Sequence, residues 1–248
     1  MRKRRRKRQN LLILQAAFLA VFLVAFTYSK LSDISEPGNR KSIKTVEYET
    51  ESTSVNNNNT NSRYLLLVNK DNKLPDDYDV DLKTLNNGRS QVDETIYSSL
   101  RDMLTDGSDQ GLNFCVASAY RSRERQQEIL DNDIDMYMSH GMDYEDAREE
   151  ALKQVMPPGF SEHETGLALD IVSLDYQLLD ENQEDTAENI WLRENCHKYG
   201  FILRYPKGKE DITGCSPESW HFRYVGREAA EYIMENGITL EEYIKCLK

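Results

Sequence analysis

The stretch at 11–28 constrains this chain more than any other feature, because it carries no charged residue and is mostly apolar. As a helix it would be about 27 Å long, enough to cross the hydrocarbon core of a typical bilayer. Seven consecutive basic residues, Arg2 to Arg8, precede it and are expected to stay in the cytoplasm. We therefore predict a transmembrane signal-anchor at 11–28 behind a basic cytoplasmic head at 1–10. The alternative is a cleaved signal peptide, but no small-residue cleavage site is evident after Ala25.

The residues before and after this segment carry opposite net charge. The chain has 31 Lys and Arg against 43 Asp and Glu, and the head holds seven of the basic residues, so the remainder carries a net charge of −19. This acidity argues against nucleic acid as a partner of the main domain. The segment at 29–62 is rich in Ser, Thr, Asn and Glu, which indicates a flexible linker. A single domain at 63–248 would then lie outside the cytoplasm, held at the cell membrane by one span.

The hydrophobic pattern of this domain predicts strands separated by helices or long loops. Short β-prone runs predict strands at 114–120, 167–172, 201–204 and 220–225. Helical spacing predicts helices at 92–104, 124–138, 143–155, 186–199, 227–236 and 240–247. Gly107 is expected to stop the first helix, Thr186 to cap the fourth, and Gly200 to close it. The order of elements predicts a mixed α+β domain.

Four cysteines lie in the predicted domain, and no two of them form a CxxC pair. A zinc site built from cysteines is therefore not expected. Cys115 lies in an apolar run, so we expect a buried thiol rather than a nucleophile. Export permits disulfides, and Cys196 with Cys215 is our candidate bridge.

Two short segments gather the groups that can do chemistry: SEHETGLALD, which ends at Asp170, and ESWH, which ends at His221. His163, Asp170 and His221 offer two imidazoles and one carboxylate, which suffice for a catalytic zinc with an open fourth position. Glu218 lies three residues before His221, where it could act as a general base without binding the metal.

Two other interpretations stay open on the residues alone. A His near an Asp is usually an ordinary hydrogen-bonded pair. Non-haem iron also uses two His and one carboxylate, but its usual pattern places His and carboxylate two residues apart, whereas His163 and Asp170 are seven apart. Glu218 beside the third ligand also favours hydrolysis over oxygen chemistry, so zinc is preferred.

Several ordered motifs resemble those of one family. Ser-x-His-x-x-Gly-x-Ala-x-Asp, ending at Asp170, and Glu-x-Trp-His, ending at His221, are similar to motifs of the VanY-type D-alanyl-D-alanine carboxypeptidases of the M15 metallopeptidase family. Further similar segments are LVNK at 67–70, SAYRS at 118–122 and WHFRYVG at 220–226. The family often has Gly in place of Ala119 and Pro in place of Ser219. Neither departure removes a group that does chemistry.

The resemblance implies a role for each residue of the motifs. His163, Asp170 and His221 would bind Zn²⁺, and Glu218 would be the catalytic base. Arg121 would be a second catalytic residue whose guanidinium holds a substrate carbonyl or terminal carboxylate. The alternative for Arg121 is a salt bridge to an acidic neighbour.

Two further residues and the fold follow from the same resemblance. Ser161 would bind substrate or orient the neighbouring imidazole, and Gln126 would line the substrate pocket. The implied fold is a small antiparallel sheet flanked by helices, shared with the hedgehog-type zinc domains.

The activity that the resemblance implies is that of a zinc-dependent D,D-carboxypeptidase, which removes the C-terminal D-alanine from peptidoglycan stem peptides. One alternative is an L,D-carboxypeptidase on tetrapeptide stems, which these motifs do not distinguish. The other is a non-catalytic, zinc-stabilised domain that binds the cell wall. The presence of both Glu218 and Arg121 argues against that second alternative.

Overall fold

The computed structural model describes residues 63–247. The predicted head, transmembrane segment and linker lie outside the described residues and stay predictions. Within 63–247, no helix combines the length and the apolar character that crossing a membrane requires.

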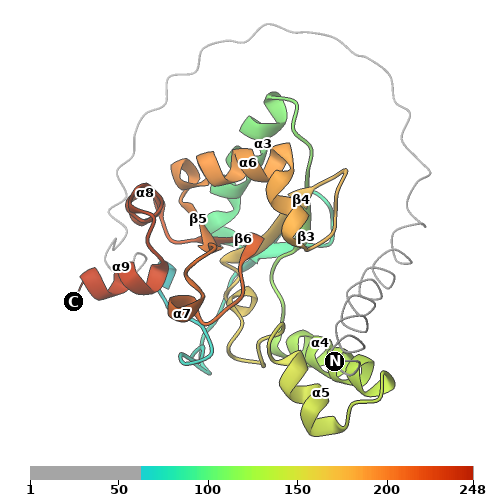
Figure 1. The fold of residues 1–248 in the computed structure, drawn as a ribbon. Helices are drawn as coiled ribbons and strands as arrows, with labels where there is room; N and C mark the ends of the chain where they lie inside the picture. Colours follow the sequence, from blue (N-terminus) through green and yellow to red (C-terminus); the bar gives the residue numbers. More distant parts are fainter. Residues whose placement is uncertain (1–62, 248) are drawn as a thin grey trace, which may run out of the picture. The chain divides into compact units, whose positions relative to one another are not determined.

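A four-stranded antiparallel sheet lies at the centre of the described domain (Figure 1). Its strands lie in the order β3-β4-β6-β5. Their bounds are β3 Phe114–Ser118, β4 Ala168–Ser173, β5 Phe201–Tyr205 and β6 Glu218–Tyr224. All six residues of β4 are buried, so this central strand is covered on both faces. The four strands predicted from the sequence are all present.

The main hydrophobic core joins the sheet to helices α3 (Tyr97–Asp109) and α6 (Ala187–Asn195). Its buried members include Leu100, Leu169, Ile171, Leu192, Phe201 and Phe222. Burying each such side chain contributes roughly 1.5–3 kcal/mol relative to exposure. The core thereby holds β4 and β6 in a fixed register. As predicted, Thr186 caps α6, where its side chain accepts a hydrogen bond from the Asn189 backbone.

A second apolar cluster packs the C-terminal helices against β5. It joins Ile202 of β5 to Ile233 and Leu240. These last two come from α8 (Arg227–Asn236) and α9 (Leu240–Cys246). Both helices were expected from the sequence, whereas the short α7 (Glu210–Thr213), between β5 and β6, was not.

Helices α4 (Arg123–Ser139) and α5 (Tyr144–Ala151) form a hairpin with an apolar cluster of its own. Figure 1 shows the two helices packed on each other, apart from the helices that cover the sheet. The cluster contains Leu130 and Ile134 of α4 and Ala147 of α5. Helix α5 ends four residues before its predicted end, and turns follow it.

The start of the predicted helix at 92–104 is wrong. β2 (Gln91–Asp93) pairs with β1 (Leu82–Thr84) in a hairpin that the sequence analysis missed. The Asp93 side chain then caps a single 3-10 turn before α3 begins. Strands of three residues carry too few positions to show an alternating pattern.

The predicted end of this helix at 104, with Gly107 as its stop, is also wrong, because α3 runs on to Asp109. Gly107 serves packing instead. A Cβ at this position would lie 2.5 Å from the ring of Phe114, so glycine lets β3 approach the helix.

The predicted bridge between Cys196 and Cys215 is wrong, since all four cysteines are free thiols. Cys196 is buried in the main core, whereas Cys215 is half-buried after α7. Cys115 is half-buried rather than fully buried, and this burial raises the pKa of its thiol. A raised pKa lowers the thiolate fraction, which agrees with a structural role.

Candidate metal site and active site

Two neighbouring strands position the carboxylate and one imidazole of the predicted metal site. Asp170 in β4 lies directly opposite His221 in β6 in the antiparallel register. Directly opposed residues have their side chains on the same face of the sheet. Asp170 Oδ1 and His221 Nδ1 are accordingly 3.1 Å apart.

His163 comes from the 3-10 turn Glu162–Thr165, which leads into β4. Gly166 ends this turn in the left-handed region, with φ 71°, and a Cβ there would lie 2.9 Å from the backbone nitrogen of Asp93. Glycine therefore lets the turn close against the β1–β2 hairpin. The turn brings His163 Nε2 to 3.3 Å from Asp170 Oδ2.

The three predicted ligands form one buried cluster. One donor atom from each of His163, Asp170 and His221 lies within 4.8 Å of the other two. Burial lowers the pKa of His163, which favours its neutral form. Burial opposes ionisation of Asp170, but the two histidines hold its pKa below the usual range. Burial opposes protonation of His221, but its contacts with Asp170 and Glu162 raise its pKa to about 9. Because a neutral imidazole and an ionised carboxylate are the forms that bind metal, a metal ion would displace a proton from His221.

Each imidazole turns its other nitrogen toward an oxygen. His163 Nδ1 lies 2.8 Å from the carbonyl oxygen of Ala119, so Nδ1 carries the proton and Nε2 remains a metal donor. His221 Nε2 lies 3.5 Å from Glu162 Oε2, which leaves Nδ1 facing Asp170. Two nitrogens and one carboxylate, with acceptors behind the imidazoles, are typical of catalytic zinc. The residues present therefore fit a zinc ion.

Glu218 reaches the site through an irregularity in β6. In a regular strand, residues three apart point to opposite faces. The register of β5 and β6 shifts between Leu203 and Tyr205, so that Tyr205 pairs with Glu218. Glu218 Oε2 consequently lies 3.5 Å from His221 Nδ1. Burial raises the pKa of Glu218 to about 7, which suits a group that takes and releases a proton near neutral pH.

Arg121 lies at the edge of the same cluster, shortly after β3. Its Nη2 donates to Asp170 Oδ2 at 3.2 Å, and its Nε donates to Ser118 Oγ at 2.9 Å. Its side chain is 21% exposed, so the guanidinium is held in place and still reachable from solvent. The salt bridge that the sequence offered as the alternative is present, to Asp170 of the cluster, and the catalytic role of Arg121 stays a prediction.

The two residues predicted to bind substrate are both buried. Gln126 is 1% exposed; its Nε2 donates to the Met156 carbonyl at 2.7 Å, and its Oε1 accepts from Arg121 Nη1 at 3.4 Å. It thus lies behind Arg121 rather than at an open surface. Ser161 is 5% exposed and directly precedes the turn that carries His163. The roles of these residues stay predictions.

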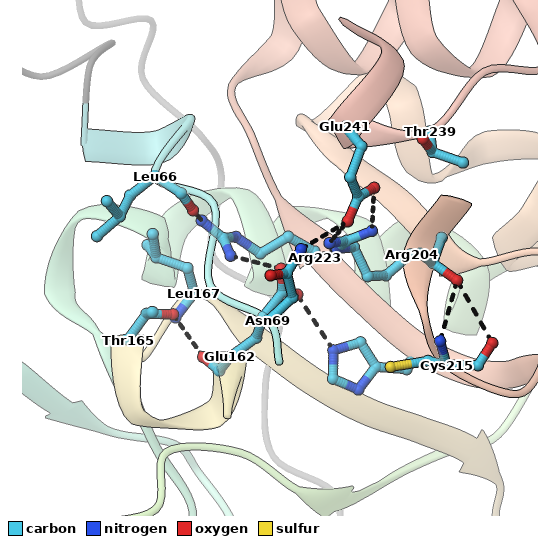
Figure 2. A network of polar contacts seen from close by, with 12 residues as sticks. Leu66, Asn69, Glu162, Thr165, Leu167, Arg204, Cys215, Arg223, Thr239 and Glu241 are labelled. Carbon is cyan, nitrogen blue, oxygen red and sulfur yellow. Dashed lines mark hydrogen bonds and ion pairs between the residues drawn. The ribbon is translucent and has the colours of Figure 1, made fainter. Parts of the chain in front are cut away.

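The sequence analysis missed Glu162 and the two cations around it (Figure 2). Glu162 Oε1 accepts from Arg204 Nε at 2.8 Å and lies 3.0 Å from Arg223 Nη1. Burial opposes ionisation of Glu162, but both arginines hold its pKa below the usual range. A signal was available, because each arginine lies within an apolar strand. A charge in such a strand needs a buried partner.

The chain is similar to known proteins in sequence and in fold. A family profile described as VanY, D-alanyl-D-alanine carboxypeptidase, matches residues 89–227. A D-alanyl-D-alanine carboxypeptidase of Enterococcus faecalis is 42% identical over 186 residues, which cover 74% of this chain and 66% of that protein. The chain belongs to the VanY family. The family membership expected from the sequence is therefore confirmed.

Two solved VanY structures are similar in fold as well. VanYB in complex with D-alanine-D-alanine is 42% identical, with a TM-score of 0.67 over 75% of this chain and 99% of that one. A zinc(II) complex of a mutant vancomycin-resistance D,D-pentapeptidase VanY is 41% identical, with a TM-score of 0.66 over 73% and 99%. The expected small antiparallel sheet flanked by helices is thereby confirmed.

Proposed function

We propose that this VanY-family chain is a zinc-dependent D,D-carboxypeptidase, which removes the C-terminal D-alanine from peptidoglycan stem peptides. The observation that carries the proposal is the buried cluster of His163, Asp170 and His221, with Glu218 3.5 Å from His221. The names of the relatives support it. One is a D-alanyl-D-alanine carboxypeptidase, and the two solved structures hold D-alanine-D-alanine and Zn(II).

Each residue of the site has a separate role in the proposed hydrolysis. Zinc held by His163 Nε2, Asp170 and His221 Nδ1 would polarise the scissile carbonyl and lower the pKa of a water molecule toward neutrality. Glu218 takes the proton of the attacking water and passes it to the leaving amine. Its pKa of about 7 allows both transfers near neutral pH. Arg121 offers a cationic donor to the substrate carbonyl or its terminal carboxylate.

The buried polar residues support these groups. Gln126 Oε1 accepts a hydrogen bond from Arg121, and Gln126 Nε2 donates one to the carbonyl of Met156. These two bonds connect Arg121 to the segment that precedes the 3-10 turn carrying His163. Ser161 precedes that turn, and its carbonyl accepts from the Glu164 backbone at 3.2 Å, which fixes the start of the turn. These contacts support an orienting role for both residues beside their predicted part in binding substrate.

The test uses the full-length chain loaded with zinc and offered pentapeptide and tetrapeptide stems separately. Mass spectrometry follows the loss of alanine, with a chelated sample and Glu218→Gln as controls. Release of D-alanine from pentapeptide, absent from both controls, is the expected result. Cleavage of tetrapeptide alone would establish an L,D-carboxypeptidase instead. Zinc binding without cleavage of either peptide would indicate a non-catalytic domain that binds the cell wall.

We further propose that 11–28 anchors the chain in the cell membrane, with a linker at 29–62 and the carboxypeptidase domain at 63–248 outside the cytoplasm. The uncharged apolar stretch behind seven basic residues supports this. In cells that express the chain, it should sediment with membranes, and external protease should digest the domain. A chain that is released intact into the soluble fraction would contradict the anchor.

A further inference from the structure

Glu162 lies directly behind one of the proposed metal ligands. Its Oε2 is 3.5 Å from His221 Nε2. Both atoms are buried, and within the described residues neither forms a hydrogen bond, so the two are in ion-pair contact without one. Leaving a buried polar atom unpaired costs about 1–3 kcal/mol, so a small movement that brings these two atoms into a hydrogen bond would be favourable.

The two oxygens of the Glu162 carboxylate contact different groups. Oε1 meets both cations, with Arg204 Nε at 2.8 Å and Arg223 Nη1 at 3.0 Å. Oε2 is left for His221 alone. The side chains of Glu162, Arg204 and Arg223 are 0% exposed, so the carboxylate is fixed from one side and faces the imidazole on the other.

The contacts continue from Arg204 to the C-terminal helix, as Figure 2 shows. Arg204 donates from Nη1 to Glu241 Oε2 at 2.9 Å and from Nη2 to Glu241 Oε1 at 2.6 Å. Asn69 Nδ2 also donates to Glu241 Oε1, at 3.2 Å. Arg223 is held separately, since its Nη2 donates to the carbonyl oxygen of Leu66 at 2.9 Å. Helix α9 and the segment before β1 therefore both hold the arginines that contact the Glu162 carboxylate.

We propose that Glu162 is a positioning residue for the metal site. Its Oε2 accepts a hydrogen bond from the Nε2–H of His221, which fixes the tautomer of the imidazole and presents Nδ1 to the metal. Arg204 and Glu241 extend this support to α9. The inference rests on the proposed function, since it concerns the same metal site. Its test reads metal binding separately from turnover, so the two can fail independently.

The alternative is that the cluster only stabilises the fold. Buried ion pairs contribute little net stability, and breaking one is costly because it leaves an uncompensated charge. A loss of stability in a Glu162 variant would therefore be expected under either account. The metal affinity and the geometry of the bound metal separate them.

The main experiment compares Glu162→Asp and Glu162→Gln in the full-length chain. Asp keeps the charge that pairs with the arginines but withdraws it from His221, and Gln keeps the length but removes the charge. Glu188→Gln is the matched control: Glu188 is 8% exposed, and its Oε1 accepts from the Asn113 backbone at 3.0 Å, away from the metal site. Zinc affinity is measured by competition with a chelator, and ligand geometry by the absorption spectrum of the cobalt(II)-substituted protein.

We expect zinc affinity to fall by about 10- to 100-fold in both Glu162 variants, with a changed cobalt spectrum. Glu188→Gln should match the wild type in both measurements. Glu241→Gln, one contact further away, should lower zinc affinity less than either Glu162 variant. Glu162 variants that keep wild-type zinc affinity and cobalt spectrum, while losing stability, would overturn the inference. If Glu162→Gln does not fold, Glu162→Asp decides by the same two measurements.

A further variant, His221→Ala, separates a failure of the positioning role from a failure of the proposed function. If His221→Ala binds zinc as tightly as the wild type, the proposed metal site itself fails, and the role of Glu162 fails with it. If His221→Ala loses zinc while both Glu162 variants keep it, only the positioning role is overturned.

Discussion

The sheet and the α4–α5 hairpin bury acidic groups in opposite ways. Beside the sheet, Glu162, Asp170 and Glu241 each have a cation or an imidazole within 3.5 Å. In the hairpin, Asp133 is 9% exposed, and among residues 63–247 its carboxylate forms no ion pair. Burial alone raises the pKa of Asp133 to about 6.

This difference separates two kinds of buried charge. A paired carboxylate stays ionised and holds its neighbours in one arrangement, as Glu162 does between two arginines and an imidazole. An unpaired carboxylate costs stability whenever it is ionised. We therefore expect substitutions around the sheet to change metal binding and turnover. Substitutions in the hairpin should change stability and leave turnover intact.

The largest effect is expected from Glu218→Gln. The amide cannot accept the proton of the attacking water, so kcat should fall by about 10²- to 10⁴-fold. Zinc content should stay at the wild-type value, because Glu218 is not a proposed ligand. Steady-state release of D-alanine and metal analysis measure the two quantities. Glu128→Gln, on the exposed surface of α4, is the control. An equal loss of kcat in both variants would contradict the role of Glu218 as the general base.

Arg121→Lys comes next. Lysine keeps the charge but cannot donate to Asp170, Ser118 and Gln126 at once. We expect kcat/KM for pentapeptide to fall by about 10²- to 10³-fold. Denaturant unfolding should show a much smaller change. A loss of stability with unchanged kcat/KM would show that Arg121 is only a structural partner of Asp170.

Asp133→Asn should stabilise the protein in a pH-dependent way. The carboxyl ionises at its ordinary pKa of 3.8 when unfolded and at about 6 when folded, so the folded protein holds more protons between these values. Stability therefore falls as pH rises from about 4 to 6, and the cost persists above 6. The variant avoids this cost, which is at most about 3 kcal/mol for two pKa units.

Urea unfolding of wild type and Asp133→Asn at pH 4 and pH 7 measures this difference. The variant should be more stable at pH 7 and nearly equal at pH 4, with unchanged turnover. A variant that is less stable at pH 7 would mean that Asp133 has a stabilising partner in solution.

The smallest effect is expected from Asp143→Ala at the start of α5. The Asp143 side chain caps this helix by accepting from the Asp146 backbone at 3.0 Å. Removing such a cap costs about 1 kcal/mol. Thermal unfolding should show that loss, while zinc affinity and kcat stay unchanged. A fall in zinc affinity would mean that the hairpin and the metal site are coupled.

Much of the fold follows from local sequence patterns. The strands of the sheet, the cap at Thr186 and the α8 and α9 helices depend on neighbouring residues, so their patterns predict them. The β1–β2 hairpin was missed because its strands are short. Gly107 was read as a helix stop because the sequence does not show that the ring of Phe114, seven positions later, packs against it after folding.

The site was predictable only where spacing carries chemistry. His163, Asp170 and His221 stand in motifs, and the structure brings them together. Glu162 was missed because its partners, Arg204 and Arg223, are some 40 to 60 positions away in the sequence. Gln126 was expected at the substrate pocket from the family resemblance, and its contact with Arg121 could not be predicted from any local pattern.

The most direct test of the account is anomalous X-ray diffraction from crystals of the zinc-loaded protein, collected at the zinc absorption edge. The account predicts one strong peak, bound by His163 Nε2, an oxygen of Asp170 and His221 Nδ1, with Glu218 near it but not a ligand. A peak elsewhere in the chain, or ligation by His221 through Nε2, would contradict it.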